Sequence, residues 1–94
     1  MKVRYYIDPQ TDVPHIYGHD VSELEVEDVL EGAVEDYPKL DGSRVAIGPA
    51  STGRILRVVY SPDPGPSSVF VITAYDLRGK PLLAYQRRRR RKHR

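Results

Sequence analysis

The sequence predicts one small α+β domain, with an acidic helix on one face of a mainly antiparallel four-stranded sheet and a basic helix at the C-terminus. Three observations lead to this fold class. Several short runs are rich in branched and aromatic residues, one segment carries helix-capping signals, and proline- and glycine-rich connections have hairpin lengths. A chain of 94 residues can bury one modest core.

Four segments have the composition of β-strands and end at turn residues. They are residues 3–7, 44–47, 55–60 and 69–75. Because strand side chains alternate, Leu56, Val58 and Tyr60 are expected to share the helix-facing side with Phe70, Ile72 and Ala74. That register places Arg57 beside Thr73, Ile55 beside Tyr75 and Arg54 opposite Asp76, and it leaves the other side partly open. Residues 37–38, Tyr-Pro, are assigned to a connection.

Two helices are expected. Ser22 and Glu25 match a capping box, and an apolar stripe continues the pattern over residues 22–33. The second helix begins after Gly79, with Pro81 in its first turn. Residues 87–92 extend it on paper, but like charges four residues apart oppose the extension, so the end is expected to fray until anions neutralise it. We therefore divide the chain into a domain, residues 1–86, and a basic tail, residues 87–94.

Composition excludes several classes of function. The chain has no cysteine, so disulfides, thiolate metal sites and cysteine nucleophiles are absent. No apolar run reaches membrane-spanning length and no signal peptide is recognisable, which favours a cytoplasmic protein without membrane contact. His15 and His19 with nearby aspartates fit a metal site poorly, since Pro14 and Gly18 argue against regular helical spacing. We expect no metal and no cofactor.

Charge is strongly segregated along the chain. All 13 acidic residues lie at or before Asp76, where six basic residues leave a balance of 6 − 13 = −7, whereas residues 77–94 carry nine basic residues and no acid. Basic arms often bind nucleic acid through phosphate. Docking on an acidic protein surface and a solvated tail are the alternatives. The residues expected to contact RNA are Arg54, Lys80, Arg87, Arg88, Arg89, Arg90, Arg91 and Lys92.

The residues that would carry any chemistry are expected near the end of the last strand, on the open side of the sheet. Arginine neutralises phosphate charge and tyrosine stacks on bases, so the candidates are Arg57, Tyr75, Arg78 and Tyr85. A salt bridge from Arg54 to Asp76 and packing of Tyr85 against the sheet are the structural alternatives. His15 or His19 is available as a proton carrier.

Three segments resemble BrnT-type toxins of the RelE-like superfamily, or a related uncharacterised RelE-like family. They are HIYGHDVS leading into EVEDVL (residues 15–30), GRILRVVY (residues 53–60), and VITAY (residues 71–75) with Tyr85 downstream. The resemblance implies a cytoplasmic, metal-independent endoribonuclease that cuts translated RNA and is neutralised by a small antitoxin. The family pattern has an arginine where this chain has Tyr75, and an acidic residue before the last tyrosine that is missing here.

Three functions therefore remain open at this point: an RNA-binding protein with endoribonuclease activity, a non-catalytic nucleic-acid-binding module, and a protein-interaction domain. A homodimer is compatible with each of them. The sequence specifies neither the RNA target nor the identity of an antitoxin.

Overall fold

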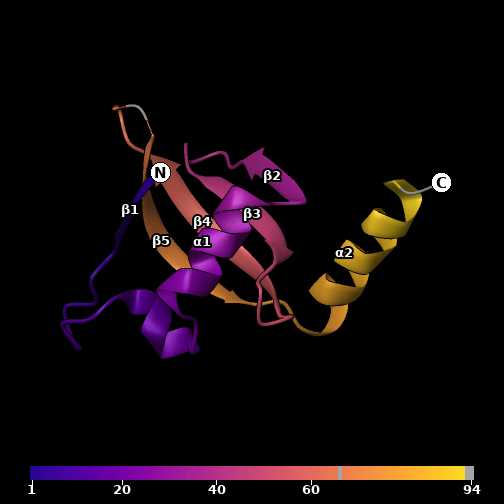
Figure 1. Ribbon diagram of the computed structural model, residues 1–94, viewed down its shortest axis with the longest axis horizontal. Coiled ribbons are helices and arrows are strands. Elements are labelled where there is room, and N and C mark those ends of the chain that lie inside the picture. The colour runs from indigo at the N-terminus through magenta and orange to yellow at the C-terminus, as the bar shows by residue number, and fades with distance from the viewer. Residues whose placement is uncertain (66, 93–94) are drawn as a thin grey trace.

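The structure, a computed structural model, describes residues 1–65 and 67–92 and confirms the α+β class. Its elements are β1 (Lys2–Tyr5), the 3-10 helix η1 (His15–His19), α1 (Glu23–Glu31), β2 (Glu35–Pro38), β3 (Arg44–Pro49), β4 (Ile55–Pro62), β5 (Ser68–Asp76) and α2 (Gly79–Lys92). The five strands form one sheet in the order β1-β5-β4-β3-β2, in which only the β1–β5 pair is parallel. Figure 1 shows α1 lying across the sheet and α2 standing beyond it at the right.

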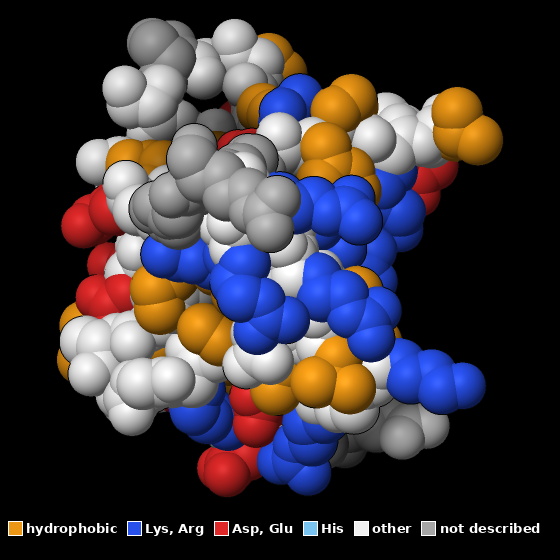
Figure 2. All heavy atoms as spheres, turned by 90° about the vertical axis from the view of Figure 1, so that its right-hand side faces the viewer, with side chains coloured by type: hydrophobic (Ala, Val, Ile, Leu, Met, Phe, Trp, Pro, Cys, Tyr) orange, Lys and Arg blue, Asp and Glu red, His pale blue; other side chains and the backbone are white. Residues whose placement is uncertain are grey.

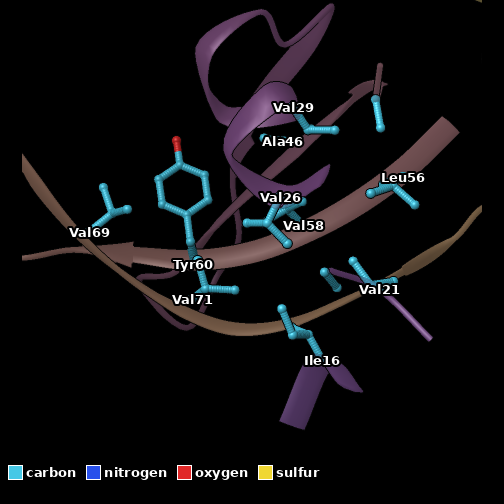
Figure 3. Packing of buried hydrophobic residues seen from close by; sticks show 12 residues of the cluster. Ile16, Val21, Val26, Val29, Ala46, Leu56, Val58, Tyr60, Val69 and Val71 are labelled. Atoms are coloured by element: carbon cyan, nitrogen blue, oxygen red, sulfur yellow. The ribbon is translucent and has the colours of Figure 1, made fainter. Parts of the chain in front are cut away.

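Helix α1 begins as the capping signals predict. The Ser22 hydroxyl accepts a hydrogen bond from the Glu25 amide at 3.2 Å, and the Glu25 carboxylate accepts one from the Ser22 amide at 3.1 Å. Val26 and Val29 are fully buried against Leu56 and Val58 of β4, as Figure 3 shows. The cap fixes where the helix starts, and the apolar stripe fixes which side of it covers the sheet.

Strand β2 was not expected, and it makes the sheet five-stranded rather than four-stranded. Residues 37–38 are not a connection, because Tyr37 pairs with Val45 and Pro38 with Arg44 in an antiparallel ladder. A proline is tolerated here because β2 is an edge strand and Pro38 is its last residue. Asp36 anchors the strand by accepting hydrogen bonds from the Tyr60 hydroxyl at 2.6 Å and Arg44 Nε at 3.0 Å.

A β-bulge in the β4–β5 pair overturns the predicted faces of β5. Val59 pairs with Thr73, but the next residue, Tyr60, pairs with Val71, so Ile72 is an extra residue. The alternation therefore changes phase. Val69, Val71 and Ala74 face α1, as predicted for Ala74 alone, whereas Phe70 and Ile72 do not. Separately from the bulge, the register differs by two residues from the predicted one, so Arg57 lies opposite Tyr75 rather than Thr73.

The second face of the sheet is covered in part by α2, so the two helices do not share one face. Tyr85 and Leu82 of α2 pack with Val45, Ile47 and Val59, which alternate with the residues that contact α1. Residues 87–92 continue α2 as regular helix. The side chain of Lys92 and residues 93–94 of the predicted tail lie outside the described residues.

Candidate nucleic-acid interface

A groove of about 410 Å³ lies between α2 and the neighbouring face of the sheet. We call it the α2 groove. It brings together three of the four candidate catalytic residues, Arg57, Tyr75 and Arg78. Its lining also includes Tyr37, Ile47, Asp76, Leu77, Pro81, Ala84 and Arg88. Tyr37 was missed by sequence reasoning because its strand was missed.

The inner end of the groove is formed by Arg57 and Tyr75, which are direct cross-strand neighbours. Arg57 Nη1 donates a hydrogen bond to the Tyr75 hydroxyl, and the guanidinium carbon lies 5.8 Å from the centre of the Tyr75 ring. Partial burial acts to lower the pKa of Arg57, but the hydrogen bond with Tyr75 leaves this pKa above its ordinary value. The pair thus presents a permanent cation held against an aromatic ring.

An aromatic row extends from this pair across the segment before α1. It consists of Tyr75, His19, His15 and Tyr6, and successive ring centres are 6.0, 5.2 and 6.0 Å apart. His15 Nδ1 lies 3.5 Å from the Asp8 carboxylate. The sequence shows two histidines four residues apart in a segment without regular helical spacing. The structure forms the 3-10 helix η1 there, and its packing places His19 beside Tyr75.

The arginines of α2 differ in their partners. Arg88 forms a two-pronged ion pair with Glu35, with nitrogen–oxygen distances of 2.6 and 2.9 Å. Within residues 1–65 and 67–92, no carboxylate forms an ion pair with Arg87, Arg89, Arg90 or Arg91. In Figure 2, which shows the side of the molecule carrying α2, blue side chains of lysine and arginine dominate the centre of the face and red side chains are mostly at its rim.

Two sequence candidates lie outside this interface. Arg54 belongs to the α1 side of the sheet, where it binds the Glu25 carboxylate at 2.7 Å and approaches Asp76 at 3.9 Å. Tyr85 is only 1% exposed and packs in the core under α2. The packing interpretation of Tyr85 is therefore confirmed, and neither residue is placed to contact a ligand in the groove. Lys80 and Arg78 are exposed at the start of α2.

The contact between Arg54 and Glu25 is a structural ion pair. Glu25 is buried and also accepts hydrogen bonds from the Thr52 hydroxyl at 2.6 Å and the Ser22 amide. The Arg54 hydrogen bond, opposed by burial, lowers the pKa of Glu25 to about 2. All of these donors are groups of the protein itself, so the carboxylate is satisfied without a ligand. The ion pair joins α1 to the loop before β4.

Comparison with known proteins finds no matching protein family, no similar curated sequence and no matching solved structure. In the part of the chain that the structure describes, no group of three or more His, Cys, Asp or Glu side chains is placed to hold a metal ion. No helix among the same residues is long and apolar enough to cross a membrane.

Proposed function

We propose that this protein binds RNA with the α2 groove and the arginine side chains of α2. The observation that carries the proposal is that α2, which lines the groove through Pro81, Ala84 and Arg88, also carries four arginines without ion-pair partners among the described residues. The same groove holds Arg57, Tyr75 and Arg78. Guanidinium groups bind phosphate oxygens and displace counterions, and tyrosine offers a ring on which a base can stack. An acidic protein would need the charge but not the rings, which favours RNA.

The acidic residues of α1 are on the far side of the sheet from this surface. Glu25, Val26 and Val29 face the core cluster that packs on one side of β4, whereas Tyr85 of α2 packs on the other. The sheet therefore separates a carboxylate-rich side from an arginine-rich side. An RNA strand approaching α2 meets positive charge without first passing the carboxylates of α1.

The test is fluorescence anisotropy with a labelled RNA of about 12 nucleotides, over a series of salt concentrations. The logarithm of the binding constant should fall linearly with the logarithm of the salt concentration, with a slope of roughly 0.7 per phosphate neutralised. Arg57→Ala should weaken binding about tenfold, by removal of a charge-assisted contact. Arg4→Ala is the matched control, because Arg4 lies at the other end of the sheet, paired with Asp63 at 2.7 Å, and this variant should bind normally. If polyglutamate competes as well as unlabelled RNA, the surface binds acidic protein instead.

A second candidate function is favoured by the aromatic row. Metal-independent RNA cleavage needs a base to take the proton of a 2′-hydroxyl, a cation to stabilise the charge at phosphorus, and an acid to protonate the leaving 5′-oxygen. The His19 ring is 6.0 Å from Tyr75, which is hydrogen-bonded to Arg57. His15 and His19 are the side chains of the row whose ring nitrogens can take up and release a proton in these transfers. If the resemblance to RelE-like toxins extends to function, such an enzyme would be a toxin that a small antitoxin protein neutralises.

Induced expression in bacteria tests this second function. An active endoribonuclease should arrest growth, and the purified protein should cleave RNA in the presence of EDTA. Arg57→Ala and His19→Ala should each abolish both effects, whereas Arg4→Ala should not. Intact RNA and normal growth at high levels of the wild-type protein would leave the binding proposal standing and exclude the enzyme.

A further inference from the structure

The segment between β1 and α1 carries three exposed or half-buried aromatic side chains, of which His19 lies against Tyr75 at the edge of the groove. Tyr6 is 42% exposed, the side chain of His15 is 36% exposed, and His19 is exposed. Tyr75, the fourth member of the aromatic row, also lines the α2 groove. The row is therefore continuous with the proposed phosphate-binding surface, but it is built by a different part of the chain.

The chemistry of this row differs from that of α2. Its members are two tyrosines and two histidines, and the Asp8 carboxylate lies 3.5 Å from His15 Nδ1. The row contains no lysine or arginine to bind phosphate groups. It offers planar rings, which are the groups that bind unpaired bases without regard to base identity.

We propose that Tyr6, His15, His19 and Tyr75 form a base-stacking subsite that binds the unpaired bases of an RNA strand whose phosphates contact Arg57 and the start of α2. This inference rests on the proposed RNA-binding function and assigns a part of it to residues 6–19. The rings of the row meet at interplanar angles of 57°, 76° and 55°, so they contact one another obliquely and leave no slot between them. Bases would stack on their outward surfaces, which makes the subsite tolerant of sequence.

The loop that carries the row is held in place by the backbone. The Tyr6 amide donates to the Val71 carbonyl at 2.9 Å, and the His15 amide donates to the Tyr6 carbonyl at 2.9 Å. Ile16 is buried in the core below the row. Side-chain changes at Tyr6 and His19 can therefore alter the outer surface without removing the contacts that hold the loop.

The experiment compares two labelled probes of about 12 nucleotides, a single-stranded RNA and an abasic strand with the same backbone. The wild-type protein should bind the RNA at least tenfold more tightly than the abasic strand. The double variant Tyr6→Ala/His19→Ala should lose about tenfold or more in RNA affinity and keep its affinity for the abasic strand, since stacking is lost and phosphate contact is not.

The matched control is Tyr6→Phe/His19→Phe, which keeps both rings and removes the hydroxyl and the imidazole. It should retain the preference for bases. Equal binding of both probes by the wild-type protein would overturn the subsite and leave RNA binding by α2 intact. A phenylalanine variant that loses as much affinity as the alanine variant would also overturn it. Failure of both probes to bind would instead refute the proposed function itself.

Discussion

The two sides of the sheet use charge in opposite ways. On the α1 side, the buried carboxylate of Glu25 is paired with Arg54, and Asp28 accepts hydrogen bonds from the Ser51 amide and hydroxyl at 2.9 and 2.7 Å. On the α2 side, Arg88 is paired with Glu35, whereas Arg87, Arg89, Arg90 and Arg91 have no ion-pair partner among the described residues. Charges of the first kind hold the fold together. Charges of the second kind remain available for a ligand.

This difference shows that a count of charges does not identify a binding surface. Arg54 and Arg90 are the same residue type, and both were expected to contact RNA, with a salt bridge to Asp76 as the alternative for Arg54. Their neighbours distinguish them. Arg54 is paired with the Glu25 carboxylate, whereas Arg90 faces solvent on a helix that carries several like charges. Like charges on one helix cost a few tenths of a kcal/mol per pair, so this clustering does not serve the stability of α2.

The largest effect is expected from removing arginine charges on the α2 side. The triple variant Arg87→Ala/Arg90→Ala/Arg91→Ala should weaken RNA binding on the order of 100-fold at low salt and flatten the salt dependence by about 2 in the logarithmic slope. Its thermal stability should stay the same or rise, because like-charge repulsion is removed. Anisotropy titrations and thermal unfolding measure both. An equal loss of affinity in Arg4→Ala/Arg44→Ala would mean that overall charge, not this helix, determines binding.

The next largest effect is expected from removing the Arg54–Glu25 ion pair on the α1 side. Arg54→Ala should lower the free energy of unfolding by about 2 kcal/mol, because the Glu25 carboxylate stays buried without its main donor. Urea unfolding measures the change. Arg78→Ala is the control, since this exposed arginine should change stability by less than about 0.5 kcal/mol. RNA affinity of folded Arg54→Ala should match the wild type, and a large loss would place Arg54 at the interface after all.

A pH series sharpens the same comparison. The pKa of Glu25 is lowered to about 2, below the value near 4.5 expected in the unfolded chain. A lowered carboxyl pKa adds stability that is present above about pH 4.5 and is lost as the pH falls toward 2. Urea midpoints between these limits should therefore fall for the wild type and fall less for Glu25→Gln. Unchanged acid sensitivity in both Glu25→Gln and Arg54→Ala would exclude the pair as its source.

The smallest effect concerns Tyr85, which the family resemblance would make catalytic. Its hydroxyl is buried and, in the part of the chain that the structure describes, has no hydrogen-bond partner. Tyr85→Phe should therefore raise stability by about 1 kcal/mol and leave RNA binding and any cleavage unchanged. Tyr60→Phe is the matched control, because the Tyr60 hydroxyl donates to Asp36 at 2.6 Å and its loss should cost about 1 kcal/mol. Loss of cleavage in Tyr85→Phe would restore the catalytic assignment.

Features set by local sequence were the ones that could be predicted. The capping box of α1 needs only residues three apart, and the α+β class needs only the alternation of the longer strands. Strand β2 was missed because Pro38 argues against a strand, although its partner β3 follows directly in the chain. The bulge at Ile72 depends on how β4 and β5 pair, so the residues of β5 alone did not reveal it. The groove could be predicted only in part. Arg57, Tyr75 and Arg78 were chosen from the sequence for their chemistry, but they line a groove with α2 because Tyr85 packs that helix against the sheet.

The parallel strand β1 also has a consequence for how copies of this protein behave together. Its four residues cover the outer edge of β5 from Ser68 to Val71, within the segment of the chain that is richest in β-forming residues. Lys2 and Arg4 alternate along β1, and charged side chains discourage a further strand from adding to an edge. Removal of β1 would expose the backbone of β5 to other chains, so this four-residue strand, whose Val3 and Tyr5 pack against the core, also protects the protein against aggregation.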